Sequence, residues 1–203
     1  MIQEESAVVG SPQQVTAVPR LLALAASLRA KSLNRRLIQV AAELGRGAGA
    51  VVELVEFREF DMPLYDADVQ ESSGMPAGAV ALRDRLAKVD GLLLAAPEYN
   101  YSMSGTLKNA IDWVSRFRPG PFRGKSAFLM SASNGAFGGN RGLWALRVPL
   151  EGLGVHVYPD MFSLPHGATG FTESGGLAEA ATHERLATMI EGYLKVARAL
   201  AHL

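Results

Sequence analysis

A regular alternation of short apolar runs with longer amphipathic stretches constrains this chain more than any other feature. The apolar runs, which are typical of buried strands, occupy residues 21–26, 51–57, 91–96, 126–131 and 155–158. The stretches with helical periodicity follow at residues 33–44, 77–88, 105–117, 140–153 and 177–200. Strands that alternate with helices pair in parallel through right-handed crossovers, which place helices on both faces of the sheet. The sequence therefore predicts a three-layer, doubly wound α/β fold with a five-stranded parallel sheet of order 2-1-3-4-5.

The length and composition fit one domain of this kind. The chain has 203 residues, of which 48% are hydrophobic and 20% charged, as is usual for a globular protein with a full core. Residues 1–18 lack periodicity and contain Gly10 and Pro12, so we expect a flexible N-terminal leader there. A single domain is then expected over residues 19–203.

Charge and residue usage argue against several classes of function. The 20 basic and 20 acidic residues cancel, so we expect neither nucleic acid nor a membrane surface as a partner. The chain has no cysteine, which removes thiolate and iron–sulfur chemistry, and its 4 histidines lack ligand spacing, so no metal site is expected. Any redox chemistry would need an organic cofactor. Residues 1–20 lack a secretory signal, and we therefore expect a cytoplasmic protein.

In an open parallel sheet, ligands bind beyond the carboxyl ends of the strands, so the loops after the first, third and fourth strands form the candidate site. The first loop, AASLRAKSLNRRL, places Ser27, Arg29, Ser32 and Asn34 around the start of a helix. Free amides, hydroxyls and a guanidinium favour a phosphate there, although Ser32 or Asn34 would also suit a helix cap. The loop lacks the Walker ending and the GxGxxG spacing, which favours a mononucleotide.

The loop after the third strand begins the stretch PEYNYSMSGTLKNAIDW. Ser104 is placed to cap the helix that follows, and the apolar face of that helix accounts for much of the remaining stretch. Tyr99, Asn100, Tyr101 and Met103 have no part in that packing. Aromatic side chains and free backbone amides over residues 98–101 favour a planar ring system with a polar edge.

The loop after the fourth strand, SASNGAFGGNRG, is rich in glycine, with Gly135, Gly138, Gly139 and Gly142. Glycine allows a backbone to approach a ligand closely, but a glycine-rich loop is also typical of a flexible connection. The predicted position of this loop, beside the other two, favours the ligand interpretation.

Together, these three loops resemble those of the NADPH-dependent FMN reductases, a flavodoxin-like family that includes quinone, azo-dye and chromate reductases. The resemblance covers most of residues 20–160 and departs from the family pattern at Ala26, where the family has glycine. It implies that the FMN phosphate is held by Ser27, Arg29, Ser32 and Asn34. It implies that the ring and ribityl chain lie along Pro97, Glu98, Tyr99, Asn100 and Tyr101. It implies that the pocket is completed by Ser133, Asn134, Gly135, Gly138 and Gly139.

The resemblance also implies a reaction and an assembly. An FMN-dependent NAD(P)H oxidoreductase would pass a hydride from NADPH or NADH to bound FMN and then two electrons to a small acceptor. The sequence leaves that acceptor open between a quinone, an azo compound, a metal oxyanion and free flavin. No side chain is expected to be catalytic, because the flavin carries the chemistry. Family members form dimers or tetramers, so we expect a homodimer or homotetramer, with an exposed aromatic surface around Tyr101, Trp113 and Phe117.

Two other functions compete with this one. A flavodoxin-like electron carrier would bind FMN without using NAD(P)H, but such carriers are usually strongly acidic, unlike this neutral chain. A flavin-free interaction or sensing domain would keep the fold and lose the cofactor, and the retention of all three loops counts against it.

Overall fold

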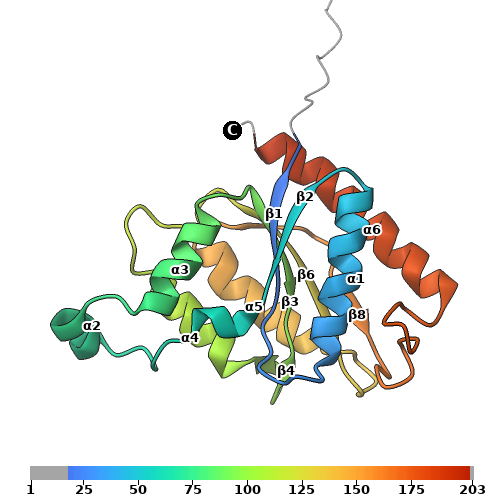
Figure 1. Ribbon diagram of the computed structural model, residues 1–203, viewed down its shortest axis with the longest axis horizontal. Helices are drawn as coiled ribbons and strands as arrows, with labels where there is room; N and C mark the ends of the chain where they lie inside the picture. Colours follow the sequence, from blue (N-terminus) through green and yellow to red (C-terminus); the bar gives the residue numbers. More distant parts are fainter. Residues whose placement is uncertain (1–17, 202–203) are drawn as a thin grey trace, which may run out of the picture.

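A parallel β-sheet runs through the centre of the structure, a computed structural model that describes residues 18–201 (Figure 1). Its strands are β1 (Arg20–Ala25), β2 (Val51–Val55), β3 (Gly91–Ala95), β6 (Ser126–Ala132), β7 (His156–Val157) and β8 (Phe162–Leu164). Their order is β2-β1-β3-β6-β7, with β8 also paired to β6, and every pair is parallel. The predicted order 2-1-3-4-5 is confirmed, with β7 and β8 sharing the fifth position.

The three central strands are buried along almost their whole length. Every residue of β3 and β6 is buried, and in β1 only Arg20 is exposed. A central strand of a parallel sheet is covered by helices on both faces, so it is apolar throughout rather than alternating. This burial explains why β1, β3 and β6 read as apolar runs without an alternation of polar residues, broken in β6 only by the buried Ser126 and Ser131.

The longer helices cover the two faces of this sheet. They are α1 (Leu33–Gly47), α3 (Ala77–Leu86), α4 (Gly105–Val114), α5 (Asn140–Gly152) and α6 (Ala180–Leu200). Helices α1 and α6 lie on one face, and α3, α4 and α5 lie on the other (Figure 1). Successive residues of β1 alternate between the two cores, with Leu22 packed toward α3, α4 and α5 and Leu21 toward α1 and α6. The predicted three-layer, doubly wound arrangement is therefore confirmed.

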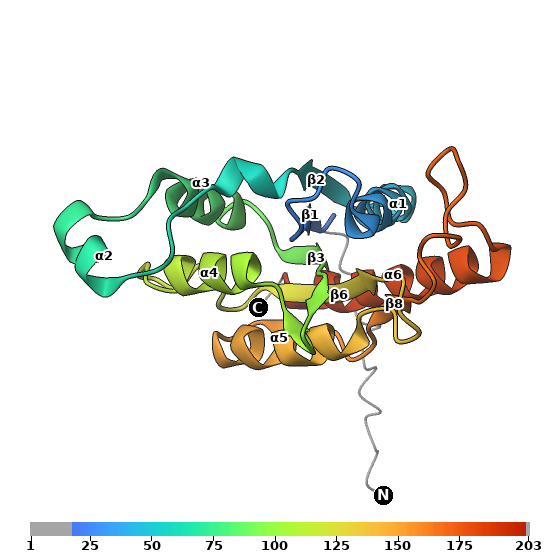
Figure 2. The same ribbon diagram turned by 90° about the horizontal axis from the view of Figure 1, so that it is seen from below.

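The segment between β2 and α3 contains two short helices that the sequence did not predict. The first, η1 (Phe57–Phe60), is a turn of 3-10 helix, and the second, α2 (Ala67–Ser73), extends away from the rest of the molecule (Figure 2). Helix α2 has no buried residue, so no apolar periodicity marks it in the sequence. Phe57 was predicted to lie in the second strand, but it begins η1 instead.

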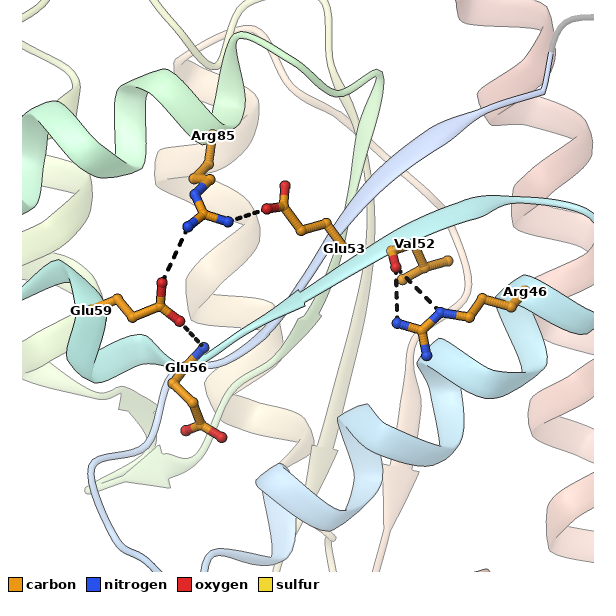
Figure 3. Close-up of polar contacts among 6 residues, drawn as sticks. All are labelled: Arg46, Val52, Glu53, Glu56, Glu59 and Arg85. Atoms are coloured by element: carbon orange, nitrogen blue, oxygen red, sulfur yellow. Dashed lines mark hydrogen bonds and ion pairs between the residues drawn. The ribbon is translucent and has the colours of Figure 1, made fainter.

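Polar contacts explain why β2 ends before η1 (Figure 3). The backbone N–H of Glu56 donates to the carboxylate of Glu59 at 3.0 Å, as part of a capping box at the start of η1. Arg85 of α3 donates to the carboxylates of Glu53 in β2 and of Glu59 in η1. These contacts tie β2 and η1 to α3.

The end of the chain also differs from the prediction. The fifth strand, predicted at residues 155–158, is reduced to the two residues of β7, and the pairing with β6 resumes at β8. The last helix begins at Ala180 rather than at residue 177, because Leu177 pairs with Phe171 in an antiparallel bridge.

The leader predicted for residues 1–18 lies outside the described residues, apart from Val18. Within residues 18–201, no helix is both long and apolar enough to cross a membrane.

Candidate cofactor site

Asn34 joins the loop after β1 to the end of β6. Its side-chain Nδ2 donates to the carbonyl oxygen of Ala132 at 3.1 Å, and its Oδ1 accepts from the backbone N–H of Ala132 at 3.0 Å. Both residues are buried. The amide of Asn34 is thus engaged on both sides by protein backbone, and it fixes the first turn of α1 against the start of the loop after β6.

Ser104 makes a second link, between the loop after β3 and the loop after β1. Its Oγ donates to the carbonyl oxygen of Ala26 at 3.3 Å and accepts from the backbone N–H of Leu107 at 3.3 Å. The predicted cap of this helix is therefore confirmed, since Ser104 is the N-cap of α4.

Glu98 makes the third link, between the loop after β3 and the start of α5. Its carboxylate accepts from the backbone N–H groups of Arg141 at 3.1 Å and Gly142 at 3.3 Å, and from Nε of Arg141 at 2.8 Å. Asn34, Ser104 and Glu98 thus connect the three predicted loops in pairs, at the carboxyl edge of the sheet. This edge is where β4 is labelled in Figure 1.

The loop after β1 presents positive charge and free donors at the start of α1. Ser32 is the N-cap of α1, with its Oγ accepting from the N–H of Asn34 at 3.2 Å, and Ser27 of the same loop is also buried. Arg29 and Lys31 are exposed, and the ion pairs found among residues 18–201 include neither of them. The first turn of α1 has no acidic residue. This arrangement suits an anion such as a phosphate.

The loop after β3 folds into a two-stranded hairpin of β4 (Glu98–Tyr99) and β5 (Ser102–Met103). Its two turn residues, Asn100 and Tyr101, have φ angles of 50° and 66°, as a type I′ turn requires. Positive φ is unusual for a residue as large as tyrosine. Tyr99 and Tyr101 are 50% and 70% exposed, so the hairpin presents aromatic surface close in the chain to Pro97, which lies two residues beyond the end of β3.

The guanidinium of Arg141 lies over this aromatic surface. It stands 4.2 Å from the ring centre of Tyr101 and 4.9 Å from that of Phe137, which belongs to the loop after β6. The cation therefore bridges the hairpin and the glycine-rich loop on their exposed side.

The glycine-rich loop divides into an exposed and a buried part. Ser133 is partly buried, and Asn134 and Gly135 are exposed, with the N–H of Gly135 donating to Oγ of Ser133 at 3.1 Å. Gly138 and Gly139 are buried and have positive φ angles of 59° and 85°.

These two buried glycines pack against protein backbone and side chain. A Cβ on Gly138 would stand 2.7 Å from the carbonyl carbon of Leu164 in β8, and one on Gly139 would collide with Oγ of Ser131 in β6. Glycine at these positions lets the loop lie directly on the strands. Of the three glycines that the resemblance places in the pocket, Gly135 is the one where a Cβ would meet only an ordinary contact, at 3.6 Å from Oγ of Ser133.

The sequence did not reveal a fourth loop, over residues 165–170, which follows β8. The N–H of Gly167 donates to the carbonyl oxygen of Ser133 at 3.0 Å, so this loop lies beside the loop after β6. Next to it is a cavity of about 400 Å³, whose lining includes His166, Thr169 and Arg185. In the sequence, β8 is marked only by Phe162–Leu164 before Pro165, and a segment this short cannot be distinguished from a loop by its pattern.

The aromatic surface expected around Tyr101, Trp113 and Phe117 is present only in part. Trp113 is fully buried, and its Nε1 donates to the carbonyl oxygen of Pro63 at 2.8 Å. Phe117 is partly buried, with the guanidinium of Arg83 over its ring. The expectation was therefore wrong for Trp113, because its helical position faces the core rather than solvent.

The three joined loops fit FMN better than a dinucleotide. The start of α1 offers serine hydroxyls and unpaired cations for one phosphate, and the sequence there lacks the turn that would hold a second. The hairpin offers exposed aromatic surface that suits a planar ring, and Ser104, which follows it, is bonded to the loop after β1.

Comparison with known proteins places the chain in a family. The family model described as NADPH-dependent FMN reductase matches residues 19–169. The quinone reductase of Escherichia coli is 42% identical over 129 residues, which are 63% of this chain and 67% of that protein. The NAD(P)H-dependent FMN reductase of Pseudomonas aeruginosa is 42% identical over 137 residues, 68% of this chain and 72% of that protein. The solved structure of FerB, a flavoenzyme NAD(P)H:(acceptor) oxidoreductase of Paracoccus denitrificans, has a TM-score of 0.76 at 28% identity and covers 88% of this chain and 96% of FerB. The chain belongs to the NADPH-dependent FMN reductase family, as the motifs of its three loops had indicated.

Proposed function

We propose that this chain is an FMN-dependent NAD(P)H oxidoreductase whose acceptor is a quinone. The observation that carries the proposal is the joining of the three loops by Asn34, Ser104 and Glu98 at one edge of the sheet, in a member of an FMN reductase family. When bound, FMN supplies the redox chemistry, since its ring takes a hydride from a nicotinamide and returns two electrons to an acceptor. The chain supplies binding and orientation.

The proposed phosphate site is the start of α1. Arg29 is the exposed cation that meets the phosphate, and Ser27 and Ser32 add hydroxyls beside the free amides of the helix. Asn34 has a different role in this proposal, because its amide is already engaged with Ala132. It holds the phosphate site and the loop after β6 at a fixed separation.

The proposed ring site lies between the hairpin and the loop after β6. Backbone amides of residues 98–101 would hold the polar edge of the ring, and Pro97 lies between β3 and this hairpin. On the other side, the partly buried Ser133 and the exposed Asn134 and Gly135 would face the ring, while Gly138 and Gly139 hold their loop on the sheet. Oriented amide dipoles at such a site stabilise negative charge on a reduced ring without a proton-donating side chain.

The quinone acceptor and NADPH as donor rest on the comparisons. The Escherichia coli relative is named a quinone reductase, and the matching family is described as NADPH-dependent. The balanced charge of the chain counts against an electron carrier that docks on larger redox partners through complementary charge.

We also propose that the chain forms a homo-oligomer in the cytoplasm, where NAD(P)H is available. The support for assembly is the exposed apolar surface of the hairpin, the loop after β6 and α5, which carry Tyr99, Tyr101, Phe137, Trp144 and Val148. Trp144 and Val148 are 58% and 74% exposed on successive turns of α5, and apolar surface of this kind is typical of an interface. Light scattering of the flavin-loaded protein tests the assembly, and a monomeric mass would contradict it.

Reconstitution tests the proposed function directly. The purified chain is loaded with FMN, and oxidation of NADPH and of NADH is followed with benzoquinone, an azo dye, chromate or free FMN as acceptor. We expect the largest kcat/KM with NADPH and benzoquinone. Bound FMN that neither nucleotide reduces would favour the electron carrier, and a chain that binds no FMN would favour a flavin-free domain.

A further inference from the structure

We propose that Glu98 and Arg141 are positioning residues, which lock the hairpin of residues 98–103 to the start of α5 so that two of the three loops behave as one rigid unit. The inference rests on the proposed function, because it assigns the ring side of the FMN site to this unit. The Glu98 carboxylate and the Arg141 side chain act on the cofactor through the loops that they hold.

The contacts of Glu98 show how the hairpin is held to the start of α5. Helix α5 begins at Asn140, and its N-cap residue, Gly139, has no side chain to cap it. The carboxylate of Glu98 takes that place from another part of the chain, since its Oε2 accepts from the N–H groups of Arg141 and Gly142. Its Oε1 accepts from the guanidinium of Arg141, at 2.8 Å from Nε and 2.7 Å from Nη2. Only 9% of the Glu98 side chain is exposed, so water does not replace these donors.

Arg141 also contacts the tip of the hairpin. Its guanidinium, fixed by Glu98, lies 4.2 Å from the ring centre of Tyr101. Tyr101 is the turn residue with the φ angle of 66°, a conformation that a large side chain keeps only where its surroundings hold it. Glu98 and Tyr101 stand at the base and tip of one hairpin, so a single guanidinium restrains both.

The negative charge of Glu98 is balanced by groups at the start of α5. The carboxylate faces a guanidinium and the positive end of α5, and both would be left without their anion if Glu98 were neutral. Gln at position 98 keeps one amide oxygen as an acceptor but loses the charge and the second acceptor. It therefore loosens the hairpin and the start of α5 together.

The test measures amide hydrogen exchange and flavin affinity in the Glu98→Gln protein. In the apoprotein, we expect faster exchange in residues 98–103 and in residues 139–143, by similar factors. We expect the affinity for FMN to fall by about tenfold and the affinity for riboflavin to fall by the same factor, because Glu98 positions the loops at the ring, which both flavins have. Arg29→Ala is the contrasting variant, since it should weaken FMN and leave riboflavin unchanged.

Two further variants separate positioning from folding. Arg141→Met should reproduce the exchange and affinity changes in a protein whose α5 is still capped by Glu98, and Arg141→Lys should restore part of both. Glu151→Gln is the matched control, because it removes the same charge from an ion pair with Arg147 at the other end of α5, and it should change neither readout. If Glu98→Gln does not fold, Arg141→Met alone decides the proposal.

The proposal is overturned if exchange rises only in residues 139–143 while residues 98–103 and both flavin affinities stay within about twofold of the parent protein. Glu98 would then be a helix cap and no more. A parent protein that binds neither flavin would contradict the proposed function instead, and the exchange data on the apoprotein would still show whether the two segments are coupled.

Discussion

The side-chain amide of Asn34 and the backbone of Ala132 form a closed pair of hydrogen bonds, 98 positions apart in the chain. The pair joins the start of α1 to the end of β6 inside the core, next to the loops proposed to hold the cofactor. Because both partners are buried, each lost bond leaves a backbone group without a partner in a place that water does not reach.

Asn34→Ala is expected to destabilise the fold by about 2–4 kcal/mol, since the N–H and C=O groups of Ala132 would both lose their partner. Urea unfolding of the apoprotein measures this change. Asn134→Ala, at an exposed position in the neighbouring loop, is the control and should lie within about 0.5 kcal/mol of the parent protein. A similar small effect for Asn34→Ala would mean that the pair is not essential to the core.

Arg29→Ala is expected to weaken FMN binding by about ten- to a hundredfold, because a charge-assisted hydrogen bond to phosphate contributes roughly 1.5–3 kcal/mol. Fluorescence titration of the apoprotein gives the dissociation constant. Folding should change little, since Arg29 is exposed on its loop. Arg123→Ala, exposed at the opposite edge of the sheet, serves as the control for loss of a cation. An FMN constant within twofold of the parent's would place the phosphate elsewhere.

Ser131→Ala is expected to leave stability unchanged or to raise it by about 1 kcal/mol. The Oγ of Ser131 is buried beneath Gly139 and has no hydrogen-bond partner among residues 18–201, so its removal relieves an uncompensated polar group. Ser126→Ala in the same strand is the matched comparison, because its buried hydroxyl is paired with that of Tyr193 at 3.0 Å, and it should be destabilising. Thermal unfolding of the two variants side by side makes the measurement, and a destabilised Ser131→Ala would show that its hydroxyl has a partner.

Tyr193 is expected to make the fold sensitive to alkaline pH. Burial raises the pKa of its hydroxyl above the ordinary value of 10.0, so above that pH the unfolded chain loses a proton that the folded chain keeps. The stability contributed by the neutral hydroxyl is complete below pH 10 and falls by about 1.4 kcal/mol per unit as the pH rises further. Urea unfolding at pH 8 to 11 tests this, and Tyr193→Phe should flatten the decline. Equal slopes for the two proteins would exclude Tyr193 as the cause.

Much of the fold was determined by sequence pattern alone. The apolar runs of β1, β3 and β6 are a local signal, because a strand that is buried on both faces is made of apolar residues. The periodicity of α1 and α4 is local too, because a helix that is buried along one stripe has apolar residues at regular spacing. The caps at Ser32 and Ser104 are local as well, since each hydroxyl meets an amide two or three residues away. The same local chemistry is what made the three loop motifs recognisable.

Other features were decided only by the tertiary structure, because they depend on groups that are distant in the chain. The sequence offers Asn34 as a cap or a phosphate ligand, and only the position of Ala132 shows that its amide is engaged in the core. Glu98 gave no sign that it caps α5, since that helix begins 42 residues beyond it at Asn140. For the same reason, the burial of Trp113 was misjudged and the strand β8 was missed. Spacing along a chain fixes the local element, while burial and hydrogen-bond partners are fixed by what folds against it.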